Sequence, residues 1–157
     1  ECLNLCVAAS SSEVLTKMDD DDYYGPQYLV DLLHALDYSK ADVVGKQAHY
    51  MHFASTKATV LRIAHMEHRS TRFVVGPTIT ARREVFESHP FEAVNRGEDT
   101  GFLRAVTTAG GSIYSADRFN FCQFRQGDGH TWNVSDEELA ASGEIRFFGD
   151  PKELITV

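Results

Sequence analysis

The sequence has few of the features that mark secreted or membrane proteins. Its 3 cysteines are an odd number without the spacing of a metal site, so we expect reduced core residues. No apolar run approaches the length of a membrane-spanning helix, and no secretory signal is visible. These features predict a cytoplasmic protein.

Positive charge is also scarce. The chain carries 15 Lys and Arg against 23 Asp and Glu, and the formal net charge of −8 argues against nucleic acid as a partner. Its 157 residues, 43% of them hydrophobic, suffice for about one domain with a sizeable core.

Strand-like and helix-like segments alternate along the chain. Residues 13–18 are typical of a strand, and 97–111 form the clearest helix pattern after that of 27–39. The alternation predicts an α/β fold with a mostly parallel or mixed sheet. In the helix predicted at 27–39, one face is expected to carry Tyr28, Leu32, Leu33 and Leu36.

Four consecutive aspartates, 19–22, follow the first predicted strand. Adjacent carboxylates repel, which raises the pKa of at least one of them unless a cation neutralises the run. An extended segment would place Asp19 and Asp21 on one side, where both can bind one hard divalent cation. The alternative is an acidic loop that favours the following helix electrostatically. We favour the metal, because four clustered carboxylates need a compensating cation.

Gly97, Glu98 and Asp99 stand at the start of a predicted helix. The helix dipole favours an ionised carboxylate there, which suits a general base at neutral pH. Ordinary charge complementarity at a helix start explains the same residues equally well.

The stretch "FRQGDGHTW" is predicted to be a glycine-bearing loop. Arg125 can bind phosphate in bidentate fashion, His130 is a candidate metal ligand, and Trp132 can act as an apolar lid. The alternative is a loop that a structural tryptophan anchors to the core. The other histidines have no metal-ligand spacing and are expected to be structural; they are His34, His49, His52, His65, His68 and His89.

In this order and spacing, the segments resemble a family 2 glycosyltransferase with the GT-A fold. Residues 2–36 resemble the family's helix, strand, Asp-x-Asp loop and following helix, with Asn4 at the usual helix asparagine. "VVGPTITARREVFE" is similar to the segment that lines the sugar pocket, and "GEDTGFLRA" to the Glu-Asp motif. "RQGDGHTW" resembles the loop that closes over the donor diphosphate.

The resemblance implies a metal-dependent, inverting transfer of a sugar from a nucleotide-sugar donor to an acceptor hydroxyl. UDP-sugars are the default donors, the acceptor is a saccharide or another hydroxyl compound, and the cofactor is Mn²⁺ or Mg²⁺. The implied roles are catalytic base for Asp99; donor-diphosphate binding for Asp19, Arg125, His130 and Trp132; and metal binding for Asp21, Asp19 and His130.

The resemblance covers nearly the whole chain but not the whole family domain. The family begins with nucleotide-binding strands that have no counterpart here, so residues 1–157 are expected to be the C-terminal part of a GT-A-like (Rossmann-like) catalytic domain. Its expected parts are the Asp-x-Asp loop (19–22), the acceptor and base region (72–110) and the closing loop (125–133). By itself, this piece is expected to be inactive and to self-associate through the open sheet edge.

Two other functions use comparable residues. Two-metal nucleases and phosphatases also cluster acids around cations, although the net charge counts against a nuclease. The chain could also be a truncated glycosyltransferase-like module without catalytic activity.

Overall fold

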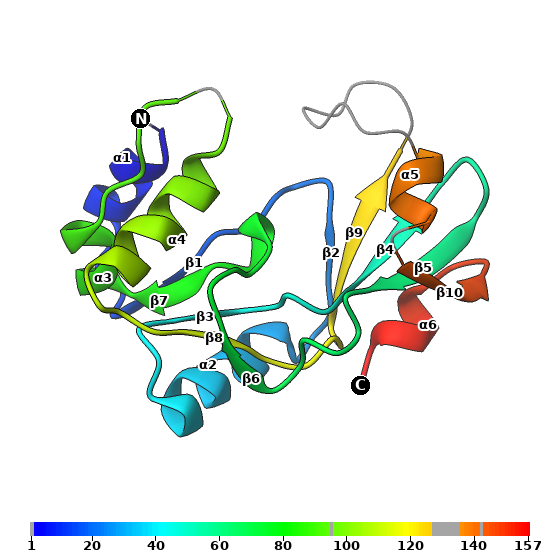
Figure 1. The fold of residues 1–157 in the computed structure, drawn as a ribbon, viewed down its shortest axis with the longest axis horizontal. Helices are drawn as coiled ribbons and strands as arrows, with labels where there is room; N and C mark the ends of the chain where they lie inside the picture. The colour runs from blue at the N-terminus through cyan, green and yellow to red at the C-terminus, as the bar shows by residue number, and fades with distance from the viewer. Residues whose placement is uncertain (1, 95, 127–135, 142) are drawn as a thin grey trace.

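The computed structural model describes residues 2–94, 96–126, 136–141 and 143–157. Within these ranges the chain forms two five-stranded mixed sheets with helices around them. Figure 1 shows the two sheets side by side, the first with most of the helices and the second with the C-terminal segments. The predicted α/β class with mixed strand directions is therefore confirmed, but the strands form two sheets instead of one.

The first sheet is covered by helices on both faces. Its elements are β1 (Val14–Thr16), β3 (Val43–Gly45), β6 (Arg69–Thr71), β7 (Thr80–Arg82) and β8 (Ile113–Ser115), with α1 (Cys2–Ala9), α2 (Tyr28–Ser39), α3 (Arg83–Ser88), α4 (Glu98–Thr108) and the 3-10 turn η1 (Gly76–Thr78). The strand order is β1-β7-β3-β8-β6, and β3 runs parallel to β8. Successive strand residues point to opposite faces. Val43 therefore packs in the cluster that contains α4, and Val44 in the cluster that contains α2.

The second sheet is built around β4 (His49–Phe53), a strand that is buried along its whole length. Its elements are β2 (Tyr23–Tyr24), β4 (His49–Phe53), β5 (Ala58–Arg62), β9 (Phe121–Arg125) and β10 (Gly143–Phe148), with α5 (Asp136–Ala141) and α6 (Lys152–Ile155). The order is β10-β5-β4-β9-β2, and every residue of β4 is buried. Met51 packs with Leu139 of α5, whereas Tyr50 packs with Ile155 of α6. The two short helices therefore lie against opposite faces of this sheet.

The chain passes repeatedly from the first sheet to the second. Residues 17–22 connect β1 to β2, residues 46–48 connect β3 to β4, and residues 116–120 connect β8 to β9. Lys46 is fully buried, and its Nζ donates to the carbonyl oxygen and to Oδ1 of Asp117, both at 3.0 Å. This pairing joins two of the connections. The aspartate run belongs to the remaining one.

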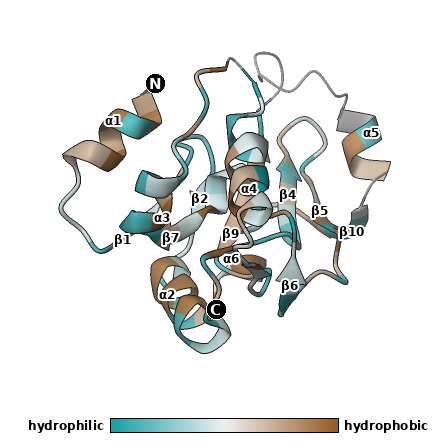
Figure 2. Cartoon of the chain, turned by 60° about the vertical axis from the view of Figure 1, so that its left-hand side comes forward, coloured by the Kyte–Doolittle hydropathy of each residue, from teal (hydrophilic) through white to brown (hydrophobic). Residues whose placement is uncertain are grey.

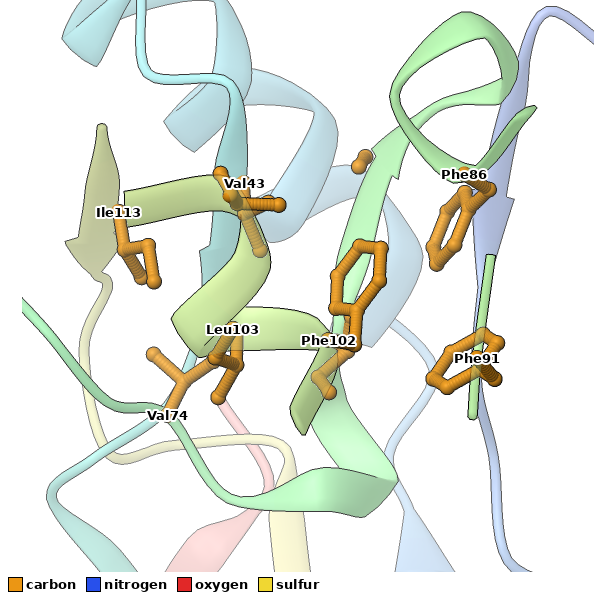
Figure 3. Packing of buried hydrophobic residues seen from close by; sticks show 10 residues of the cluster. Val43, Val74, Phe86, Phe91, Phe102, Leu103 and Ile113 are labelled. Atoms are coloured by element: carbon orange, nitrogen blue, oxygen red, sulfur yellow. The ribbon is translucent and has the colours of Figure 1, made fainter. Parts of the chain in front are cut away.

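The helix α4 is held by stacked phenylalanines (Figure 3). The Phe102 ring lies 5.0 Å from that of Phe86 and 4.9 Å from that of Phe91, centroid to centroid, with nearly parallel planes. Phe102 is fully buried, and Leu103 beside it packs in the same cluster. This packing fixes the position of the N-terminus of α4, which begins after Gly97.

The helix α2 differs in one respect from its predicted face. Tyr28, Leu32 and Leu36 are buried as expected, but Leu33 is 47% exposed and Ala35 takes the inward position. In Figure 2 most of α2 has the brown colour of hydrophobic residues. Some of these residues face solvent, since Leu29 is also exposed. None of the helices in the described residues is long and apolar enough to cross a membrane.

Candidate functional site

The aspartate run forms a tight turn, so the extended segment predicted for it is wrong. The backbone N–H of Asp22 donates to the carbonyl of Asp19 at 3.4 Å, which folds the chain back on itself. The backbone N–H of Asp19 donates to the Tyr24 hydroxyl at 2.8 Å, and that hydroxyl donates to the carbonyl of Pro77 at 3.1 Å. The run is thus attached to η1. The helix α2 has no side-chain cap, so the alternative of a helix-capping acidic loop gains no support from the geometry.

A cavity of about 400 Å³ lies beside this turn, between residues of the two sheets. The first sheet and its connections contribute the acids, whereas the second sheet contributes His49, Arg62 and Arg125. The carboxylates that line it belong to Asp19, Asp21, Asp22, Glu98 and Asp99.

Asp99 is brought to the aspartate run by three local features. It lies in the first turn of α4, whose N-cap Gly97 has φ +86°, a left-handed conformation that favours glycine. The Nζ of Lys17 lies 3.3 Å from Asp99 Oδ2 and 2.9 Å from Asp19 Oδ1. Gly76 leaves the space for this approach, since a Cβ there would lie 1.9 Å from Asp99 Oδ2.

Burial, with some repulsion from neighbouring carboxylates, raises the pKa of two of these acids, Asp22 and Asp99. Burial raises the pKa of Asp22 to about 7, and the negative charges of Asp21 and Asp19 raise it further. The hydrogen bond that Asp22 accepts from the backbone N–H of Phe124 acts in the opposite direction and lowers this pKa. Burial also raises the pKa of Asp99, against the lowering effect of Lys17. Besides Lys17, the cavity is lined by Arg62, Arg96 and Arg125, so its five carboxylates face four cationic side chains.

Lys17 itself is charged at neutral pH. Burial lowers its pKa, but the hydrogen bond to Asp19 and the charge of Asp99 outweigh burial, so the net shift is upward. Its side chain is only 12% exposed.

A neutral imidazole also lines the cavity. Burial lowers the pKa of His49 to about 4, and its Nδ1 lies 2.9 Å from the carbonyl of Gln47. That carbonyl is an acceptor, so Nδ1 carries the proton and donates to it. In the described part of the chain, His49 Nε2 is buried without a hydrogen-bond partner.

Four of the six predicted site residues line this one cavity. Asp19, Asp21, Asp99 and Arg125 come from a turn, a helix start and a strand that are far apart in the sequence. His130 and Trp132 lie outside the described residues, as does most of the predicted closing loop.

Lys17, Gly76 and His49 also belong to the site but were not predicted for it. The sequence could have predicted the role of Lys17, because this residue stands two positions before Asp19 and so lies on the same side of an extended chain. No sequence feature predicts the roles of Gly76 and His49, since these depend on contacts with α4 and with the cavity.

The described residues hold no group of three or more His, Cys, Asp or Glu side chains placed to bind a metal ion. Asp19 and Asp21 both line the cavity, and their carboxylate oxygens are the kind of ligand that hard divalent cations prefer. Such a cation would need further oxygen ligands from a bound diphosphate or water.

No protein-family model and no curated protein matches the chain. Among solved structures, it is similar to the crystal structure of S. aureus TarS 1-349 in complex with UDP-GlcNAc, with a TM-score of 0.60 and 17% sequence identity. The similarity covers 86% of this chain and 42% of that one, so the chain spans less than half the length of this neighbour. At this identity the likeness shows a shared fold.

Proposed function

We propose that this chain is part of a metal-dependent glycosyltransferase that transfers a sugar from a nucleotide-sugar donor to an acceptor hydroxyl, with inversion. The observation that carries this proposal is the meeting of Asp19, Asp21, Asp99 and Arg125 in one cavity of about 400 Å³. The shared fold supports it, because the similar structure contains UDP-GlcNAc, a nucleotide sugar. In this proposal residues 1–157 belong to a GT-A-type catalytic domain of family 2.

The proposed reaction forms a bond from the acceptor oxygen to the anomeric carbon and breaks the bond from that carbon to the diphosphate. The Asp99 carboxylate takes the proton of the attacking hydroxyl, and the nucleoside diphosphate leaves with the bonding electrons. Lys17 opposes the effect of burial on Asp99 and so favours the ionised form that a base requires.

Asp21, together with Asp19, would hold Mn²⁺ or Mg²⁺, and Arg125 would contact the donor diphosphate. When bound, such a cation neutralises the negative charge that develops on the leaving diphosphate. His130 and Trp132 are proposed to bind the donor diphosphate, and His130 also the cation, as the family resemblance implies.

The proposed substrates follow from the same chemistry. A UDP-sugar is the first donor to test, because the similar structure contains one, and the acceptor is a saccharide or another hydroxyl compound. The three cysteines are free thiols, but only Cys122 is buried; Cys2 and Cys6 are exposed, so the core positions expected for these two are wrong. The cytoplasmic location stays a proposal from the sequence. Self-association is a separate proposal; the second sheet ends in β10, on which Ile145 and Phe148 are exposed.

The test is a thermal-shift panel of UDP-sugars with and without Mn²⁺ on the full-length protein, because a ligand that binds the folded state raises its stability. We expect UDP-GlcNAc or another UDP-sugar to raise the melting temperature in the presence of Mn²⁺, and Asp21→Asn to abolish that rise. The parent protein should also release UDP when acceptor saccharides are added. If no nucleotide sugar binds, or if nucleic acid or a phosphate ester is hydrolysed instead, the proposal is wrong.

A further inference from the structure

Lys17 lies between two carboxylates to which the proposed function gives different roles. Asp19 belongs to the metal and diphosphate side, whereas Asp99 is the proposed base on α4. The Lys17 Nζ is within 2.9 Å of Asp19 Oδ1 and 3.3 Å of Asp99 Oδ2, so one ammonium contacts both. Asp19 and Asp99 are far apart in the sequence, and Lys17 is the contact that joins them.

Both the backbone and the side chain of Lys17 hold it in this position. Its backbone N–H donates to the carbonyl of Ile79 at 2.8 Å, which fixes the chain just after β1. The side chain lines the cavity and is mostly buried. A buried ammonium needs a partner, so Lys17 keeps one carboxylate if it loses the other.

We propose that Lys17 is a positioning residue that competes with the divalent cation for Asp19 and remains on Asp99 when the cation takes its place. This inference rests on the proposed function for the roles of Asp19 and Asp99. Lys17 then has two effects: it weakens metal binding, and it keeps the base oriented toward the cavity after the metal binds.

The expected effect on metal affinity follows from the charges. An ammonium within a few ångströms of a ligand carboxylate repels a divalent cation and must be displaced before that carboxylate can bind the cation. Removing its charge should therefore tighten binding by about tenfold or more at low ionic strength.

The experiment measures the binding of Mn²⁺ alone, by calorimetry and by the loss of the free Mn²⁺ resonance signal, at pH 7.5 and low salt. Lys17→Met is expected to bind Mn²⁺ about tenfold more tightly than the parent, and Lys17→Arg to stay near the parent because it keeps the charge. Lys40→Met is the matched control. Lys40 pairs with Asp37 on the exposed end of α2, so this variant makes the same change in net charge away from the cavity.

Equal Mn²⁺ affinity of Lys17→Met and Lys40→Met would overturn the inference, as would the absence of Mn²⁺ binding to both the parent and Lys17→Met. Lys17→Gln, which keeps hydrogen-bond donors without the charge, replaces Lys17→Met if the latter does not fold. The readout needs no turnover, so tighter Mn²⁺ binding in a protein that transfers no sugar would support the inference while the proposed function fails. Sugar transfer without any Lys17 effect on Mn²⁺ binding would support the proposed function and overturn the inference.

A second arm tests the role of Lys17 toward Asp99. With saturating Mn²⁺ and UDP-GlcNAc, Lys17→Met should lose turnover with little change in donor KM, and Lys17→Arg should recover part of it. Full turnover in Lys17→Met would show that Asp99 does not depend on the lysine.

Discussion

Three aspartates of one cavity have three different environments. Asp19 is paired with Lys17, Asp22 is half-buried with a pKa of about 7, and Asp99 is half-buried beside both a lysine and a glycine. A carboxylate's chemistry depends on such surroundings more than on its type. The role proposed for each aspartate therefore has to be tested at that residue.

Asp99→Asn should retain donor binding and lose turnover by roughly 10²- to 10⁴-fold, because an amide cannot accept the proton of the acceptor. UDP release in the presence of acceptor measures turnover, and thermal shift with UDP-GlcNAc measures binding. Glu98→Gln is the matched control, since Glu98 is the adjacent acid in the first turn of α4. If Glu98→Gln loses turnover and Asp99→Asn does not, the base is Glu98.

Gly76→Ala should reduce turnover about tenfold or more, because its Cβ would lie 1.9 Å from Asp99 Oδ2 and the carboxylate must move away. Gly101→Ala adds the same methyl group within α4, where the nearest atom lies at 3.4 Å. We expect that control to keep parent turnover. Equal turnover in both variants would contradict the positioning of Asp99 by Gly76.

At the scale of elements, the site is made from the ends of rigid segments. A turn after β1, the N-terminus of α4, η1, and strands β4, β5 and β9 each contribute side chains to the cavity. These elements are held by hydrophobic clusters: α4 packs with Phe86 and Phe91, whereas Met51 of β4 packs with Leu139 and also lines the cavity. The packing of these helices and strands therefore fixes the positions of the side chains that line the cavity.

Phe102→Ala should lower the free energy of unfolding by about 3–5 kcal/mol, since it removes a fully buried ring from a three-phenylalanine stack. Urea denaturation measures the change. Leu29→Ala on α2, whose side chain is half exposed, should change stability by much less. A cost below about 1 kcal/mol for Phe102→Ala would mean that α4 is not anchored by this stack.

At the scale of the whole molecule, the stability of the fold should depend on pH through groups buried between the sheets. The pKa of His49 is about 4 in the folded chain, below its ordinary 6.5. The unfolded chain therefore binds a proton between pH 6.5 and 4 that the folded chain does not. Stability falls as pH falls through this window, and the contribution of His49 is constant above it.

Asp22 acts in the opposite sense: its raised pKa means that its contribution to stability is complete below about pH 4 and is lost as pH rises toward 7.

The histidine contribution is isolated by His49→Asn, whose side-chain amide keeps a donor near the Nδ1 position. Between pH 6.5 and 4, the parent should lose up to about 3 kcal/mol relative to this variant. Urea denaturation at several pH values gives the difference. Parallel pH profiles of the two proteins would show that His49 does not carry the predicted shift.

The sequence by itself determined the class of the fold and four of the residues that line the candidate site. Periodicity located α2, and Gly97 with the acidic residues after it located the start of α4, since these signals depend on residues close together in the chain. Local chemistry also singled out Asp19, Asp21, Asp99 and Arg125, because charge runs, helix starts and phosphate-binding side chains are visible without a structure.

Only the tertiary structure decided how these parts meet. It divided the strands into two sheets, folded the aspartate run into a turn, and turned Leu33 of α2 outward. It also brought Lys17, Gly76 and His49 into the site. Each of these outcomes depends on contacts between residues far apart in the chain, such as Gly76 with Asp99. Sequence patterns record the preferences of neighbours along the chain, whereas the free energy that selects such contacts comes from burial and packing of the whole fold.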